Sequence, residues 1–265
     1  MIGGWGKRFV SAGLAALAAG ILLASFSQAD NPNEIVVKPQ INVQDPDDIT
    51  KEGSKVWVLD FKFKGPRLIT VDIPGRGRKV CWYLWYQVTN NTEEPHTFIP
   101  DFELVTHDKN TVHHDQILPT VEKAIRKLED PSEDPSSPRI KNSVTIAAEP
   151  IPPSKLKGRP NAMPRPVSGI AIWDDVDPES NSYSIFVAGL SNGWSVTDPV
   201  PPENKPVVRR KTLQLNFRRI GDKFFQKSEE IRFVPPAQWI YRGSQLSVPG
   251  LPGASKEAKE NGAKK

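Results

Sequence analysis

The sequence predicts an all-β fold, a sandwich of mainly antiparallel strands with one helix inserted near 120–129. At least eight short strand-like segments are separated by turn residues, which is the pattern of a sandwich. The 26 prolines are too many for long helices or central strands. A β-barrel is the alternative architecture for the same pattern. The expected organisation is a signal peptide at 1–29, a flexible lead-in at 30–52, the β-sandwich domain at 53–248 and a disordered tail at 249–265.

The N-terminus carries the pattern of a secretory leader. Lys7 and Arg8 precede an apolar run at 9–26, and the small residues Ser27 and Ala29 follow it. We therefore expect cleavage before Asp30 and a secreted or periplasmic protein with no stable membrane span after cleavage. The alternative is that the run is kept as an anchor, although glycine and several alanines dilute it.

The first half of the domain contains the clearest strand signals. Apolar residues alternate with more polar ones at 57–63, which predicts a strand with one buried face. A shorter strand is expected at 68–73. The segment 79–89 is apolar on both faces, which predicts a central strand covered on both sides. It contains Cys81, the single cysteine, which we expect to be a buried, inert thiol.

Weaker signals predict the remaining elements. A strand at 102–106 turns at 108–110 and returns through 111–115. An apolar stripe of helical period then predicts the inserted helix, capped by Thr120 and ended by Pro131. A strand is a candidate at 143–148, and 170–173 with 183–188 is interpreted as a hairpin. A clean alternation at 213–218 predicts a strand with one face toward water.

Two stretches are similar to a known group of proteins. They are WYLWYQVTNNT at 82–92 with FELVT at 102–106, and SGIAIW at 168–173 with IFVAGLSN at 185–192. Together they resemble extracellular immunoglobulin-like domains in an uncharacterised family of secreted planctomycete proteins, over about 56–241. The resemblance implies an elaborated immunoglobulin-like β-sandwich. It implies no activity, because the family brings none.

Composition excludes some classes of function. The net charge of +4 falls toward balance once Lys7 and Arg8 are removed, and the remaining basic residues are scattered. A nucleic-acid partner is therefore not expected. There is no G-x-S-x-G nucleophile motif and no phosphate-binding loop in the sequence.

One cluster of histidines could hold Zn²⁺. If 108–110 turns a hairpin, His107 could face His113 or His114 across it, with Asp115 as a carboxylate ligand. His113 and His114 are adjacent and point to opposite faces of a strand, so at most one can join His107. The alternative is an exposed polar hairpin.

An acidic loop could hold Ca²⁺. Asp175, Asp177 and Glu179 alternate along it, between Asp174 and Asn181, and Ca²⁺ takes oxygen ligands from such positions. However, if Asp175 is the first ligand, Ser180 stands where the glycine of a calcium loop belongs. The alternative is an ordinary turn.

One loop could present an aromatic side chain for binding. Trp194 and Asn192 lie in a glycine-containing loop, where an exposed tryptophan could stack on a sugar or a partner. The alternative is that Trp194 folds back over the end of the sandwich.

These observations predict an exported, non-catalytic protein that is a binding or structural module of the cell envelope. Its partner would be a protein or a glycan, and no cofactor is required. Two alternatives stay open: a metal-dependent hydrolase that uses His107 with His113 or His114, and a calcium-stabilised adhesion module.

Overall fold

The computed structural model describes residues 34–37, 56–130, 139–155, 163–197, 207–221 and 231–243. The predicted leader at 1–29 and the predicted tail at 249–265 lie outside these residues. Within the described residues, no helix is both long and apolar enough to cross a membrane.

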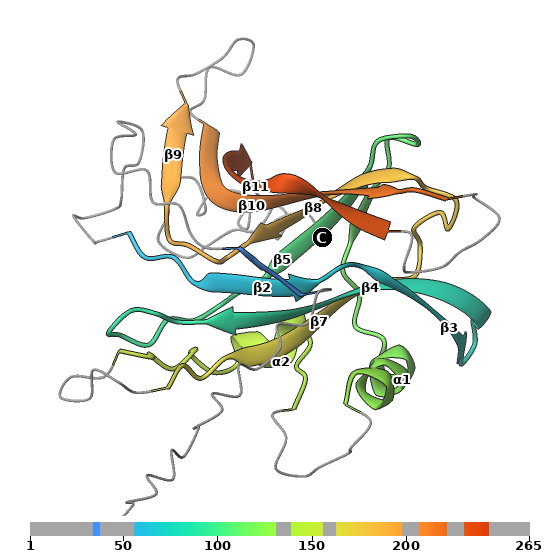
Figure 1. Cartoon of the computed structure of the whole chain (residues 1–265), viewed down its shortest axis with the longest axis horizontal. Coiled ribbons are helices and arrows are strands. Elements are labelled where there is room, and N and C mark those ends of the chain that lie inside the picture. Colours follow the sequence, from blue (N-terminus) through green and yellow to red (C-terminus); the bar gives the residue numbers. More distant parts are fainter. Residues whose placement is uncertain are drawn as a thin grey trace, which may run out of the picture. The chain divides into compact units, whose positions relative to one another are not determined.

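The described strands form two mostly antiparallel sheets and no closed barrel, which confirms the predicted all-β, sandwich-like class (Figure 1). Sheet A contains β1 (Glu34–Val37), β2 (Asp60–Lys64), β3 (Arg67–Ile73), β4 (Gly77–Thr89) and β7 (Val167–Trp173). Sheet B contains β5 (Asp101–Thr106), β6 (Val112–His114), β8 (Ser182–Ala188), β9 (Trp194–Thr197), β10 (Val207–Arg219) and β11 (Ile231–Gly243). Side chains from both sheets share the main apolar core.

Strand β4 is buried on both faces, as its sequence predicts. Trp82 and Tyr86 belong to the core between the sheets, whereas Cys81 and Tyr83 belong to a second apolar cluster on the other face of sheet A. Cys81 is fully buried, and desolvation raises the pKa of its thiol to about 11. The thiol is therefore protonated at neutral pH, as expected of a packing residue.

The inserted helix α1 (Pro119–Glu129) covers that second cluster (Figure 1). It packs through Val121 and Ile125, and its last residue, Glu129, anchors it to sheet A. The Glu129 carboxylate is almost fully buried and accepts hydrogen bonds from three side chains: Lys64 Nζ at 2.8 Å, Arg67 Nη1 at 3.1 Å and Tyr83 Oη at 2.8 Å. The predicted cap at Thr120 is wrong, because Pro119 already occupies the first turn and no side chain caps the helix.

The predicted hairpin of 170–173 with 183–188 is wrong. Strand β7 pairs with β4 in sheet A, whereas β8 pairs with β5 and β10 in sheet B. The acidic segment 174–181 is therefore a crossover from one sheet to the other. Both strands are apolar on the face that meets the shared core, so each is stabilised by packing rather than by pairing with the other.

The strand expected at 143–148 is also wrong, because this segment forms the short helix α2 (Ser143–Ala147). Asn142 accepts a hydrogen bond from the Thr145 amide, and the Thr145 hydroxyl accepts one from the Asn142 amide. This reciprocal capping box satisfies free donors at the start of the helix. The local cap therefore outweighs the weak strand preference of the segment.

Candidate functional site

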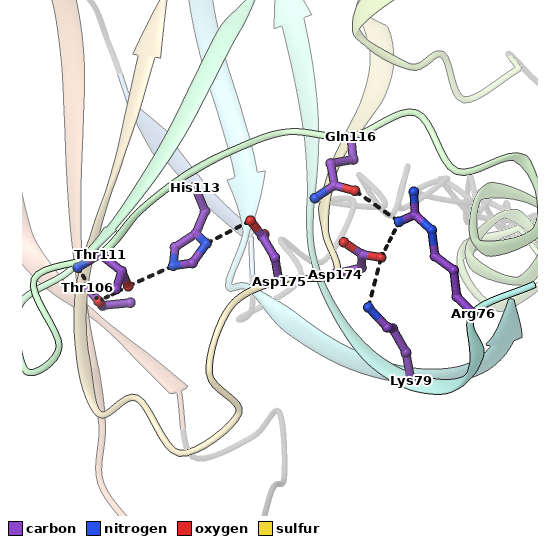
Figure 2. Close-up of polar contacts among 8 residues, drawn as sticks. All are labelled: Arg76, Lys79, Thr106, Thr111, His113, Gln116, Asp174 and Asp175. Carbon is purple, nitrogen blue, oxygen red and sulfur yellow. Dashed lines mark hydrogen bonds and ion pairs between the residues drawn. The ribbon is translucent and has the colours of Figure 1, made fainter.

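The crossover 174–181 is held at its start by a buried carboxylate. The Asp174 side chain is only 3% exposed, and its Oδ2 atom lies 2.6 Å from Arg76 Nη1 and 3.5 Å from Lys79 Nζ (Figure 2). Burial alone would raise the pKa of Asp174, but the hydrogen bond from Arg76 and the charges of Lys79 and Arg76 outweigh it and lower the pKa. This network ties the end of β7 to β4 and to the turn before it.

Acid should therefore weaken the fold through Asp174. A lowered pKa in the folded state gives stability that is present above the ordinary value of 3.8 and is lost as the pH falls through the folded pKa. We expect D174N to cost about 1–2 kcal/mol at pH 7, since both cations are half exposed. Urea unfolding at pH 7 and in steps below pH 4 measures this. The difference in the free energy of unfolding between wild type and D174N should shrink in acid. If the difference in unfolding free energy stayed constant as the pH fell, the stabilising role of the Asp174 carboxylate would be contradicted.

A second chain of contacts joins the β5–β6 hairpin to the same crossover. The hydroxyls of Thr106 and Thr111 are 2.6 Å apart, and Thr111 Oγ1 lies 2.7 Å from Nε2 of His113 (Figure 2). On the other side of the ring, Nδ1 lies 3.0 Å from Asp175 Oδ2. This last contact is a close approach of the ring to the carboxylate, because the Nδ1 atom makes no hydrogen bond of good geometry.

The order hydroxyl, imidazole, carboxylate is the order needed to activate a nucleophile. In this structure the chain instead links two loops. Thr111 is already bonded to Thr106 through both its hydroxyl and its amide, and His113 is buried. The arrangement therefore holds the hairpin against the crossover.

Asp108 provides a third link at the turn of the hairpin. Its carboxylate accepts hydrogen bonds from Ser180 Oγ at 2.7 Å and from the Asn181 amide at 2.9 Å. Burial acts to raise the pKa of Asp108, but these two hydrogen bonds outweigh it and lower the pKa. Lys109 Nζ lies 3.6 Å from Asp177 Oδ2 beside it.

The predicted zinc ligands are not brought together. His113 faces the core side of sheet B, whereas His107 hydrogen-bonds Ser184 at 2.8 Å on the other face. His114 is exposed, 3.8 Å from Asp101, and Asp115 accepts a hydrogen bond from Ser143. Alternation along β6 separates these side chains. The described residues contain no group of three possible metal ligands.

The predicted calcium ligands also have separate partners. Asp175 contacts His113, and Asp177 accepts a hydrogen bond from the Glu179 amide at 2.9 Å within an ordinary turn. Their carboxylates therefore do not converge on one point in the described crossover. The acidic segment after 170–173 connects the two sheets instead of closing a hairpin.

The structure does not expose Trp194 for binding. Trp194 begins β9, lies directly opposite Arg210 of β10 and is only 8% exposed. Asn192 accepts a hydrogen bond from the Trp57 amide at 2.8 Å, which holds the loop against the start of sheet A. Trp194 and Asn192 therefore do not offer the exposed aromatic surface that a binding role would require.

Sheet B presents a surface that the sequence spacing does not reveal. Leu213, Leu215 and Phe217 of β10 are buried in the core, so the alternate side chains of this strand point outward. Cross-strand register then places two pairs of arginines directly opposite each other on that outer face: Arg210 with Arg242, and Arg218 with Arg232. We call these four residues the arginine face.

The two pairs of the arginine face differ in their surroundings. Arg242 forms an ion pair with Glu103, and its guanidinium lies 4.0 Å from the Phe186 ring centroid. Arg218 and Arg232 are both exposed, and their side chains make no ion pair with any described carboxylate. This pair is therefore the accessible end of the face, and no carboxylate among the described residues forms an ion pair with it.

No protein-family model, no curated protein and no solved structure matches this chain. The resemblance to planctomycete proteins with an immunoglobulin-like domain stays a prediction.

Proposed function

We propose that this chain is an exported, non-catalytic binding module whose ligand is an anionic polysaccharide of the cell envelope. One observation carries the proposal: Arg218 and Arg232 stand directly opposite each other, exposed and without an ion pair to any described carboxylate. A second arginine pair, Arg210 with Arg242, lies further along the same two strands. Export is supported by the leader pattern alone.

Like charges directly opposite across two strands destabilise a sheet, by roughly 0.2–1 kcal/mol relative to a neutral pair. The Arg218–Arg232 pair of sheet B is this unfavourable arrangement, whereas Glu103 offsets the charge of Arg242 in the other pair. A bound polyanion would convert the repulsion into attraction for both strands at once. The arrangement therefore suits a surface whose partner supplies the missing negative charge.

The spacing of the face favours a long ligand over a small molecule. Arg210 and Arg218 are eight residues apart on one strand, which corresponds to roughly 26 Å at strand geometry. Between the two pairs, Gln214 lies directly opposite the exposed Gln238. Amide side chains can donate to and accept from hydroxyl groups, which favours a polysaccharide over a purely charged partner.

The test is a binding measurement on the exported chain. The protein is produced with its leader, and N-terminal sequencing that starts at Asp30 establishes export. We expect alginate, a carboxylated polysaccharide, to bind in a salt-dependent way and neutral dextran not to bind. R218Q/R232Q should weaken alginate binding about 10- to 30-fold, at about 1 kcal/mol per removed charge. Calorimetric titration measures both affinities.

The matched control is K123Q/K127Q, which removes the same charge from exposed positions of α1 on the other side of sheet A. It should leave alginate binding unchanged. R218Q/R232Q should also be slightly more stable than wild type, because the repulsion is removed. Equal loss of binding in both double variants would contradict the proposal, as would tighter binding of a DNA oligonucleotide of equal charge.

A further inference from the structure

Arg219, the last residue of β10, is buried although no carboxylate of the described residues pairs with its guanidinium. It is 4% exposed and lies on the core side of sheet B, next to the outward-facing Arg218. Its Nη1 atom donates to the Pro178 carbonyl at 2.6 Å, and its Cζ atom lies 5.4 Å from the centroid of the Trp82 ring. Its other two nitrogens, Nε and Nη2, make no hydrogen bond.

The two unpartnered nitrogens are on one edge of the guanidinium. Nε–H and Nη2–H project side by side, which is the geometry that takes the two oxygens of one carboxylate in a bidentate contact. No described carboxylate forms an ion pair with Arg219. A buried charge without a partner is strongly destabilising, so a ligand that neutralises this edge would stabilise the fold.

Other unpartnered donors lie beside it. The indole nitrogen of Trp82 and the hydroxyl of Tyr183 are buried and make no hydrogen bond. The rings of Trp82 and Tyr183 pack edge to face with centroids 5.0 Å apart. Burial raises the pKa of Tyr183 well above its usual range, and the charge of Arg219 opposes this rise.

We propose that the Nε/Nη2 edge of Arg219 binds a small carboxylate inside the sandwich, beneath the crossover 174–181, with Trp82 and Tyr183 as additional donors. A carboxylate fits better than phosphate, because it is planar and carries one charge, which a single guanidinium balances. The aromatic surroundings also provide too few donors for a dianion. This site is on the core side of sheet B and is independent of the arginine face.

The test measures thermal stability of the mature chain in sodium formate, sodium acetate and sodium chloride at equal ionic strength. A ligand that binds only the folded state raises the melting temperature with a saturable dependence on its concentration. We expect formate or acetate to raise it by about 2–4 °C and chloride not to. R219M should lose this response, and its melting temperature in chloride should equal or exceed that of wild type, because an unpaired buried charge is gone.

R218M is the matched control, because the residue is adjacent on β10 but exposed on the outer face, and it should keep the response to carboxylates. R219K keeps the positive charge but loses the paired donors of the guanidinium, so it should fold and bind carboxylate at least tenfold more weakly than wild type. If R219M does not fold, R219K tests whether Arg219 binds the carboxylate. Two results would overturn the proposal: no saturable response in wild type, as when ordered water fills the edge, or an equal response in R219M.

Discussion

Replacing Gly189 with alanine should destabilise the protein by about 4 kcal/mol or more, a large part of the 5–15 kcal/mol that stabilises a typical domain. Gly189 follows β8 and has φ +90°, where a side chain is strained by about 1–3 kcal/mol. An alanine Cβ would also lie 2.1 Å from the Ile99 carbonyl oxygen. That atom belongs to the backbone just before β5, so it cannot rotate away.

Substitution of Gly75 measures the cost of backbone strain without the cost of a close contact. It also has positive φ, +74°, but nothing lies within 4 Å of the Cβ that alanine would add. G75A should therefore lose only about 1–2 kcal/mol from backbone strain. Urea unfolding of wild type, G75A and G189A measures both losses. If G75A and G189A were equally destabilised, the contact with Ile99 would contribute nothing and the argument from close approach would fail.

The second large effect is expected at Gly169 of β7, which lies directly opposite Tyr86 of β4. The Tyr86 ring lies over the glycine, so an alanine Cβ would be 2.4 Å from its Cζ atom. The ring is fully buried and packs on Phe61 and Phe102, with centroid distances of 5.3 and 4.9 Å. It cannot move without disturbing the core, so we expect G169A to cost about 2–4 kcal/mol.

A double-mutant cycle with Tyr86 tests this cause. Shortening the side chain in Y86L removes the overlap, so G169A should cost much less in the Y86L background than in wild type. Y86F is the control, because it removes a hydroxyl that has no hydrogen-bond partner and should be nearly neutral. Additive losses for G169A and Y86L, measured by urea unfolding, would show that the ring is not what excludes the methyl group.

The sequence predicts most strands because burial on one face leaves a period of two in the residues. It also predicts that β4 is central, since both of its faces are apolar, and that Cys81 is buried. It does not identify partners: β7 and β8 are adjacent in sequence and both apolar, yet each packs in a different sheet. At α2, the apolar residues are too few to distinguish a strand from a helix, and the cap at Asn142 decides.

The candidate sites show the same limit. His107 and His113 are close in sequence, but alternation along the hairpin separates them, which a spacing rule cannot show without the register. The opposite holds for Arg218 and Arg232, which are distant in sequence and meet only through the β10–β11 register. One signal was available: the alternation at 213–218 already places Arg218 on the outward face. The same alternation places Arg219 on the core side, although arginine is a residue type that is almost never fully buried without a partner.

The crossover between β7 and β8 has a consequence for how the chain folds. Sheet A stays incomplete until residue 173 is available, although β5 and β6 of sheet B are earlier in the chain. Sheet B in turn needs β11, which ends at residue 243. Neither layer can be completed from one contiguous stretch, because the β4–β7 and β5–β8 pairings join strands that are far apart in the sequence. We therefore expect a slow, all-or-none acquisition of structure that begins only when nearly the whole domain has been synthesised.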